Sequence, residues 1–255
     1  MAISRIARTF CLEDSPNWPC PSCEGGLIKA TKGDIRTVET AASSREREND
    51  DANAWEPEFY QERFAGLLTC TNCRETIAVA GDAALESGYS DDVAYVTVLT
   101  PRYVMPSPRI LSRPVKMPNN VEALLSRAER LLWSSPAGAA NALRAAIEAI
   151  LTDRGIARSV LTKKRKRQRL DLHARILIYG ASNAELAKKM IAVKWIGNAG
   201  SHDGEEPTDS DIDDCFVLVD HVLEEIYDEK SKRLESLAKK ITKRKGPLSR
   251  VKRHK

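Results

Sequence analysis

The sequence predicts a mainly α fold, in which a bundle of about five helices follows a small β zinc ribbon. Two pairs of cysteines, each spaced Cys-x-x-Cys, lie in the first third of the chain and indicate a shared metal site. Beyond them, five prolines between residues 101 and 118 disfavour helix in that stretch. After the prolines, apolar residues recur every three or four positions, which is the period of helices that pack on a core.

The first predicted element is the zinc ribbon, whose ligands are Cys20, Cys23, Cys70 and Cys73. Glycines directly after Cys23 let the backbone reverse, and a short β-like run follows Cys73, so we expect each pair to lie at the tip of a hairpin. Four thiolates complete a tetrahedral shell and leave no open position for a substrate, so the zinc is expected to be structural. A redox-active pair is the alternative.

Composition divides the chain into four parts. A polar insertion, at residues 39–50, separates the two cysteine pairs, and a β-like run at residues 93–99 precedes the prolines. The predicted parts are a zinc ribbon with the polar insertion at residues 1–86, a strand and proline-rich connector at residues 87–115, a helical bundle at residues 116–229, and a basic tail at residues 230–255.

The helices of the bundle are predicted from their caps and apolar stripes. Asn119 or Asn120 caps a first helix, and Pro136 opens a second one that ends at Gly155, so the two form an antiparallel hairpin. The other expected helices lie at residues 170–179, from Ser182 or Asn183 toward Gly197, and from Thr208 to Tyr227.

Positive charge is concentrated in two segments, although the formal net charge is only +4. Residues 163–169 carry six Lys and Arg with no acid, and residues 230–255 carry twelve against only Glu235. Charge focused in this way favours contact with a polyanion, so nucleic acid is the expected partner; a solvated loop and tail are the alternative. The residues predicted to bind it are Lys163, Lys164, Arg165, Lys166, Arg167, Lys243, Arg244 and Lys245.

A second candidate site is a polar helix face near residue 200. At helical spacing Lys194, Asn198 and His202 lie at i, i+4 and i+8, so they share one face. Arg144 and Glu148 form another polar i, i+4 pair, on a helix otherwise rich in Ala, Leu and Ile. The glycines beside the first face each cost about 1 kcal/mol in a helix interior, which indicates close approach of a neighbouring helix or a ligand.

The segment ANALRAAIEAIL, followed further along by KWIGNAGSH, resembles the bacterial family catalogued as domain of unknown function forty-one forty-five. The likeness covers residues 101–228, and members of that family often carry an N-terminal zinc ribbon. The family is similar to the HEPN superfamily of four- to five-helix bundles, which commonly dimerise and include many metal-independent RNases of defence and toxin systems. The resemblance therefore implies a HEPN-like bundle and a homodimer.

In HEPN nucleases the working motif is an arginine followed after four to six residues by a histidine. Here Lys194 stands at the matching position, seven residues separate it from His202, and Asn198 lies between them. If the site is catalytic, His202 would act as general base or acid on an RNA 2′-hydroxyl, while Lys194 and Arg144 stabilise the phosphorane charge. The alternative is that Asn198 and His202 form hydrogen bonds to Glu148 or to backbone and fix how two helices pack.

These features lead to one expected function and two alternatives. We expect a nucleic-acid-associated regulatory or defence module; the alternatives are a metal-independent RNase that uses His202 and Lys194, and a protein-interaction adaptor that binds no nucleic acid. The sequence has no phosphate-cradling glycine loop, nucleophile elbow or usual paired carboxylates, so kinase, dehydrogenase and other hydrolase functions have no support. It also has no apolar run of about 18 residues and no signal peptide, so we expect a cytoplasmic protein without a membrane partner.

Overall fold

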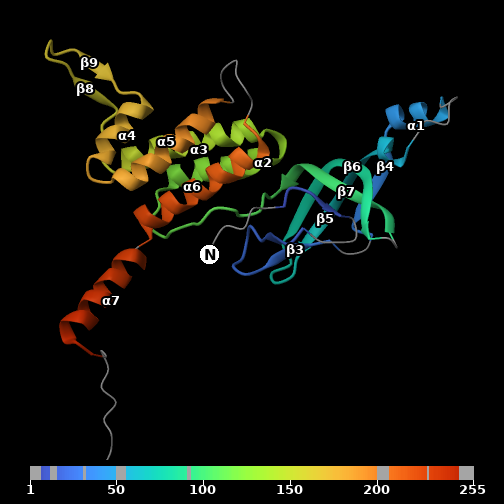
Figure 1. The fold of residues 1–255 in the computed structure, drawn as a ribbon, viewed down its shortest axis with the longest axis horizontal. Helices are drawn as coiled ribbons and strands as arrows, with labels where there is room; N and C mark the ends of the chain where they lie inside the picture. The colour runs from blue at the N-terminus through green and yellow to red at the C-terminus, as the bar shows by residue number, and fades with distance from the viewer. Residues whose placement is uncertain are drawn as a thin grey trace, which may run out of the picture.

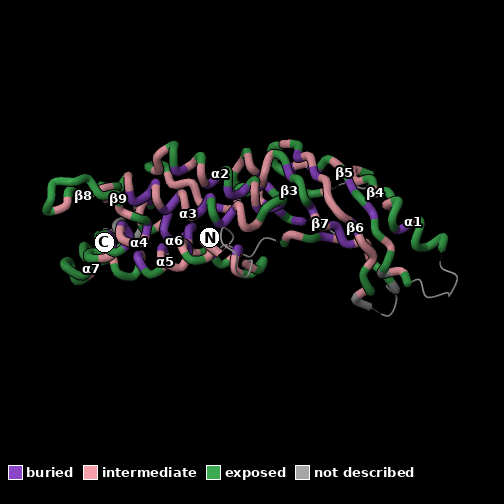
Figure 2. Tube along the Cα trace, turned by 90° about the horizontal axis from the view of Figure 1, so that it is seen from above, coloured by how far each residue is buried: buried purple, intermediate pink, exposed green. Residues whose placement is uncertain are grey.

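The computed structural model describes residues 7–11, 16–30, 33–49, 56–90, 93–199, 207–228 and 230–246. A curled antiparallel sheet, built from the N-terminal residues, lies beside a group of packed helices from the C-terminal part (Figure 1). One cluster of buried apolar side chains extends through both, and Figure 2 shows buried residues along the sheet as well as along the helices. The two parts therefore share a continuous core.

Within the described residues the sheet has seven strands, which are β1 (Phe10–Cys11), β2 (Trp18–Pro19), β3 (Leu27–Lys29), β4 (Ile35–Glu39), β5 (Gln61–Cys70), β6 (Thr76–Ser90) and β7 (Val93–Met105). Their order is β1-β7-β6-β5-β3-β2, and β4 pairs with β5. Side chains alternate between exposed and buried along β5, where Phe64 and Leu68 face the core. Helix α1 (Ala41–Glu48), which occupies the predicted polar insertion, and the 3-10 turn η1 (Pro57–Phe59) lie between β4 and β5.

The predicted fold class, mainly α with a small zinc ribbon before about five helices, was wrong. The structure is 47% helix and 25% strand, and its described residues form a large curled sheet and seven helices. The difference comes mainly from β6 and β7, which pair along strands of 15 and 13 residues. Only residues 76–80 and 93–99 of these strands have a β-like sequence. The other residues of β6 and β7 are held in the strands by cross-strand pairing and not by local propensity.

Gly81 and Pro101 explain how β7 continues through a proline. The two residues face each other across β6 and β7, at an irregularity in the register between Ala80 and Gly81. A Cβ on Gly81 would overlap the carbonyl oxygen of Thr100, so the close approach of the two backbones requires glycine. A bulge tolerates a proline and increases the local twist, so the sheet curls here and does not end.

The described C-terminal residues form α2 (Asn119–Ser134), α3 (Pro136–Asp153), β8 (Ser159–Leu161), β9 (Arg167–Arg169), α4 (Leu172–Gly180), α5 (Ala184–Ala199), α6 (Asp209–Tyr227) and α7 (Lys230–Arg244). Helix α3 is central and packs against α2, α4, α5 and α6. Its predicted start at Pro136 is confirmed: Ser135 is the N-cap, and its hydroxyl accepts a hydrogen bond from the Gly138 N–H. None of the helices in the described ranges is both long enough and apolar enough to span a membrane.

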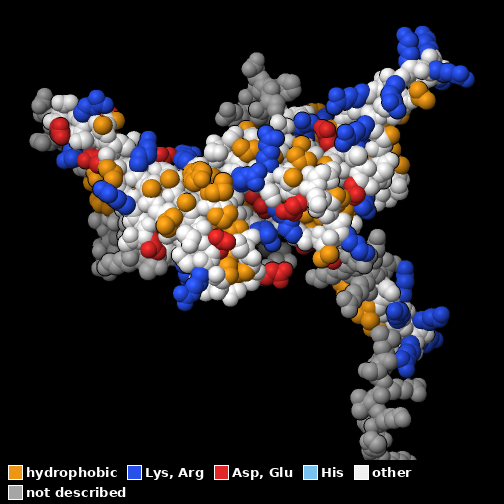
Figure 3. Space-filling view, turned by 180° about the vertical axis from the view of Figure 1, so that it is seen from behind, with side chains coloured by type: hydrophobic (Ala, Val, Ile, Leu, Met, Phe, Trp, Pro, Cys, Tyr) orange, Lys and Arg blue, Asp and Glu red, His pale blue; other side chains and the backbone are white. Residues whose placement is uncertain are grey.

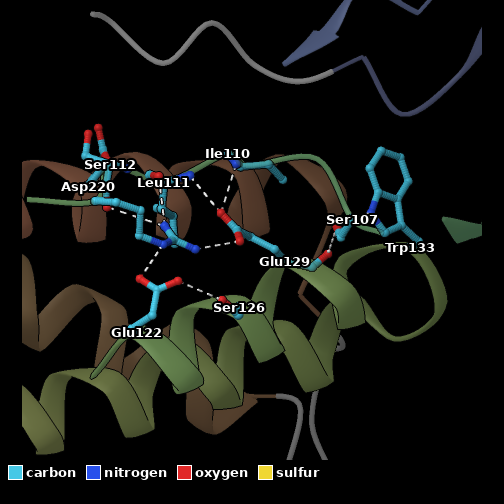
Figure 4. Close-up of polar contacts among 10 residues, drawn as sticks. Ser107, Ile110, Leu111, Ser112, Glu122, Ser126, Glu129, Trp133 and Asp220 are labelled. Atoms are coloured by element: carbon cyan, nitrogen blue, oxygen red, sulfur yellow. Dashed lines mark hydrogen bonds and ion pairs between the residues drawn. The ribbon is translucent and has the colours of Figure 1, made fainter. Parts of the chain in front are cut away.

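The connector between β7 and α2 is fixed by a buried carboxylate (Figure 4). Glu129, on α2, is only 4% exposed and accepts hydrogen bonds from the N–H groups of Ile110 and Leu111, each at 2.9 Å. Arg113 Nη2 pairs with the same carboxylate at 2.6 Å. Burial raises the pKa of Glu129, while Arg113 and the two amides act in the opposite direction. The carboxylate thus satisfies backbone groups that have no partner in a sheet or helix.

The same connector also joins the sheet to the helices. The Ser112 N–H donates to Asp220 Oδ1 on α6 at 2.6 Å, and Trp133 Nε1 at the end of α2 donates to Ser107 Oγ at 3.0 Å. Trp133 in turn packs on Trp18 of β2, with a distance of 4.7 Å between ring centroids. These contacts hold β2, the connector and α2 together.

A second joint lies at the start of the chain. Arg8 Nη2 pairs with Asp213 Oδ1 on α6 at 2.7 Å and also donates to the carbonyl oxygen of Asp209 at 2.9 Å. Because the Arg8 side chain is only 14% exposed, this ion pair is less screened than a surface pair. The sheet is therefore attached to α6 as well as to α2.

Candidate functional site

The four cysteines predicted to bind metal come together at one end of the sheet. Cys20 and Cys23 belong to the turn between β2 and β3, Cys70 ends β5, and Cys73 lies in the turn before β6. Their sulfur atoms all lie within 4.8 Å of one another. Cys20 Sγ is 3.6 Å from Cys73 Sγ, and Cys23 Sγ is 3.7 Å from Cys70 Sγ. This arrangement is compatible with a metal site.

Backbone amides point at the sulfur atoms of this cluster. The Ser22 N–H donates to Cys20 Sγ at 3.3 Å, and the Asn72 N–H donates to Cys70 Sγ at 3.4 Å. The side-chain amide of Asn72 reaches Cys23 Sγ at 3.5 Å. Hydrogen bonds of this kind stabilise thiolates, which are the form that binds a metal. Both turns therefore direct N–H groups at the sulfur atoms, as a metal site would require.

The thiols affect one another's ionisation. Burial acts to raise the pKa of Cys70, but hydrogen bonds from the Asn72 and Cys73 amides and from neighbouring thiols outweigh it, and that pKa is lowered to about 6. The backbone of Glu75 acts to lower the pKa of Cys73, but the adjacent thiols and burial raise it to about 12. Each thiolate that forms in this cluster repels the next one, because the sulfurs lie so close together. A bound cation would allow all four sulfurs to be thiolates at the same time.

We expect Gly26→Ala to weaken metal binding, because Gly26 lies directly against the cluster. A Cβ at this position would lie 2.5 Å from Cys70 Sγ and 2.7 Å from Cys23 Sγ, so the sulfurs would have to move. Substitutions of residues that position metal ligands without binding the metal themselves lower metal affinity, so we expect a loss of about 10-fold or more. Competition with a chromophoric chelator measures this loss. Gly246→Ala is the control, because a Cβ there meets nothing within 4 Å; equal affinities for the two variants would contradict the prediction.

The predicted nucleic-acid-binding residues Lys163, Lys164, Arg165, Lys166 and Arg167 form the tip of a β-hairpin and the first residue of its second strand. The Thr162 hydroxyl accepts a hydrogen bond from the Lys166 N–H at 3.2 Å, and Arg165 closes the turn with a left-handed φ of 55°. All five basic residues are exposed, and the hairpin projects from the helices (Figures 1 and 3). The basic run is thus a folded array and not only a loop.

The second basic group, Lys243, Arg244 and Lys245, lies at the C-terminal end of α7 and is also exposed. Helix α7 projects from the other helices in a different direction from β8 and β9 (Figure 1). The structure therefore does not bring the two basic segments together. A nucleic acid that contacted both would have to extend along the molecule.

The predicted catalytic residues are brought together only in part. Gly197 packs on α3 as expected, because a Cβ on it would lie 2.8 Å from the Cβ of Arg144. Arg144 Nη1 pairs with Glu148 Oε1 at 3.0 Å. Lys194 Nζ instead lies 3.6 Å from the centroid of the Trp195 ring, as a cation–π contact.

Two other residues of this predicted site are less well placed. Asn198 is half-buried near the end of α5, and His202 lies outside the described residues. The RNase hypothesis and the alternative hydrogen bond between His202 and Glu148 therefore both stay predictions.

One feature that the sequence did not predict is a cavity of about 670 Å³ beside the Arg144–Glu148 pair. We call it the arginine pocket, because its lining includes Arg144, Arg158, Arg169 and Arg175. Arg158 directly precedes β8 and Arg169 ends β9. Both belong to the same basic segment, so their position in the sequence could have predicted them as site residues. Arg175 carries no such signal, since it is a single basic residue within a mostly apolar helix.

Two family models match separate stretches of the chain. Residues 8–104 match the one described as Domain of unknown function (DUF8608), and residues 126–244 match the one described as Domain of unknown function (DUF4145). The second match supports the family predicted for the helical part, whereas the first relates the sheet to a different family, and neither identifies a zinc ribbon or a HEPN-like bundle. No curated protein matches the chain, and no solved structure does.

Proposed function

We propose that this protein is a nucleic-acid-associated regulatory or defence module, in which the β8–β9 hairpin and α7 contact a phosphate backbone. The observation that carries the proposal is the charge of the hairpin: residues 158–169 include seven Lys and Arg and no acid. Like charges packed this closely repel one another, and a polyanion relieves the repulsion while its own counterions are released. The regulatory or defence role rests on the family resemblance of the helical part.

The contacts of the hairpin favour this function over a merely solubilising loop. Two hydrogen bonds between Thr162 and Lys166 close the turn, so the charges are held in a defined array. Within the described part of the chain, no ion pair involves Lys163, Lys164, Arg165, Lys166 or Arg167. Binding to phosphates would therefore not require existing ion pairs to break.

The double variant Arg165→Gln, Arg167→Gln should bind nucleic acid with a weaker salt dependence than the parent protein. If both side chains neutralise phosphates, the slope of log K against log salt should fall in magnitude by about 0.9 per side chain on duplex DNA and about 0.7 on single strands. Fluorescence polarisation at several salt concentrations measures the slopes. The matched control is Arg127→Gln, Arg130→Gln, which removes two exposed arginines from α2.

Two results would count against nucleic-acid binding. If the hairpin and α2 variants gave equal slopes, the hairpin would not be the contact surface. If the parent protein bound neither DNA nor RNA even at low salt, the adaptor alternative would be favoured. The homodimer and the cytoplasmic location stay predictions.

We also propose that the cysteine cluster holds a structural zinc ion. Tetrahedral zinc with Zn–S bonds of about 2.3 Å places its sulfurs about 3.8 Å apart, and two of the separations here are 3.6 and 3.7 Å. Both of these separations join cysteines of different Cys-x-x-Cys pairs, as a shared ion requires, whereas a redox disulfide would form within one pair. Four thiolates close the shell, so the role of the ion would be to tie β2 and β3 to β5 and β6.

A further inference from the structure

The arginine pocket lies where three helices meet the base of the basic hairpin. Residues of α2, α3 and α4 line it, together with residues at both ends of the β8–β9 hairpin. Arg144 comes from α3, Arg175 from α4, and Arg158 and Arg169 from the two sides of the hairpin. Four separate parts of the chain thus contribute an arginine to the lining of one cavity.

Most of this positive charge has no counterion. Arg144 pairs with Glu148 at 3.0 Å, but the other three arginines form no ion pair within the described ranges of the chain. The remaining carboxylate of the lining, Asp171, caps α4 by accepting a hydrogen bond from the Ala174 N–H at 2.7 Å. The pocket therefore has a net positive charge that its own acids do not balance.

Arg175 gives the most direct sign that the pocket suits an anion. It is 3% exposed, and its Nε is buried with no hydrogen-bond partner in the described part of the chain. Arg175 Nη2 donates to Thr152 Oγ1 at 2.8 Å, and Arg158 Nε donates to the same oxygen at 3.3 Å. Burial lowers the pKa of Arg175, Arg158 acts in the same direction, and Glu148 opposes them. A buried guanidinium that shares a neutral acceptor with a second, exposed guanidinium is stabilised by an anion that pairs with both.

We propose that the arginine pocket binds the phosphomonoester group of a nucleotide, either free or at the end of a nucleic-acid strand. A phosphomonoester carries a charge of about −1.5 to −2 at pH 7 and three acceptor oxygens, which suits three unpaired guanidiniums better than the single charge of a phosphodiester. Guanidinium groups also bind phosphate through two parallel hydrogen bonds. If the ligand is the phosphorylated end of a nucleic-acid strand, this inference rests on the proposed nucleic-acid binding; if it is a free nucleotide, it does not.

The size and walls of the pocket favour a nucleotide over a bare ion. Its volume of about 670 Å³ is typical of sites for small organic ligands, which span about 300–1,000 Å³. Leu124, Leu170 and Leu172 provide apolar surface for a sugar or base, and Asn120 adds an amide. Inorganic phosphate would use the arginines alone and leave this surface without a partner.

Calorimetric titration of the full chain tests the proposal with the four nucleoside 5′-monophosphates, the matching nucleosides and inorganic phosphate. At least one monophosphate should bind about 10-fold or more tightly than its nucleoside, because the phosphate adds charge-assisted hydrogen bonds to the arginines. It should also bind about 10-fold or more tightly than inorganic phosphate, because only the nucleotide covers the apolar wall of the pocket. Arg158→Gln and Arg169→Gln should each weaken it about 10-fold. Both residues are exposed, so these changes spare the core, and Arg127→Gln on α2 is the control that should change nothing.

Oligonucleotides that carry a 5′-phosphate, a 3′-phosphate or no terminal phosphate distinguish the two sources of the ligand. A preference for one phosphorylated end would identify a strand terminus, and binding of monophosphates alone would identify a free nucleotide. Equal binding of monophosphates and nucleosides, no binding of either, or Arg158 and Arg169 variants that behave like the Arg127 control would overturn the proposal. Inorganic phosphate that binds as tightly as every monophosphate would overturn the nucleotide assignment. If strands fail to bind but a monophosphate still does, only the proposed function fails.

Discussion

Cys70→Ser is expected to abolish metal binding and to unfold the end of the sheet that carries the cysteines. Cys70 is 2% exposed, and its sulfur lies 3.7 Å from that of Cys23, so a serine there leaves an incomplete shell in a buried position. Structural zinc sites contribute on the order of 10 kcal/mol to folding, and an oxygen in place of one thiolate loses much of that contribution. The effect should therefore exceed that of an ordinary core substitution.

Metal content and unfolding together check this result. Elemental analysis of the purified parent protein should find one zinc per chain, and urea unfolding should show a large loss of stability in Cys70→Ser or after prolonged chelation. Cys11→Ser is the matched control, since Cys11 lies on β1 and is not one of the four clustered cysteines. A parent protein without metal, or a Cys70→Ser variant with full zinc content, would refute the proposed ion.

Glu129→Ala is expected to lower the free energy of unfolding by about 3–5 kcal/mol, the cost of removing one partner of a buried ion pair. The change leaves Arg113 without its buried counterion and leaves the N–H groups of Ile110 and Leu111 without an acceptor. Glu129→Gln should cost less than Glu129→Ala, because an amide oxygen still accepts from the two N–H groups although it does not neutralise Arg113.

The control for Glu129 is another carboxylate that pairs with the same arginine. Glu122 Oε2 lies 2.6 Å from Arg113 Nε, but the Glu122 side chain is 40% exposed. Solvent screens such a pair, so Glu122→Ala should cost about 1 kcal/mol or less. Urea unfolding of the three variants gives the comparison. If Glu129→Ala were no more destabilising than Glu122→Ala, the connector would not depend on the buried carboxylate.

The sequence could predict those features of the molecule that are determined by residues close to one another in the chain. The cysteine pairs and the start of α3 at Pro136 are local signals, because ligand spacing and helix caps involve residues only a few positions apart. The extent of β6 and β7 is not local. Residues 81–90 have no clear apolar alternation, and Pro101 argues against a strand unless the bulge next to it on β7 is known.

The arginine pocket shows the same limit in the candidate site. Helical spacing grouped Lys194 with Asn198 and paired Arg144 with Glu148, and the structure bears out the second pair as an ion pair. No spacing rule joins Arg175 to the two ends of a hairpin, because their proximity arises only when α4 packs against α3. A basic run in a sequence therefore indicates where charge lies along the chain and not which arginines share a cavity.

The joint between sheet and helices limits how far this protein can be cut and recombined. Although two family models match its two stretches separately, Trp18 covers Trp133, and Arg8 neutralises Asp213 across the boundary. A fragment that began after β7 would expose the indole of Trp133 to solvent and would leave the Asp213 carboxylate without Arg8. Swapping either half into another protein would thus require the acceptor to supply a matching aromatic ring and a cation.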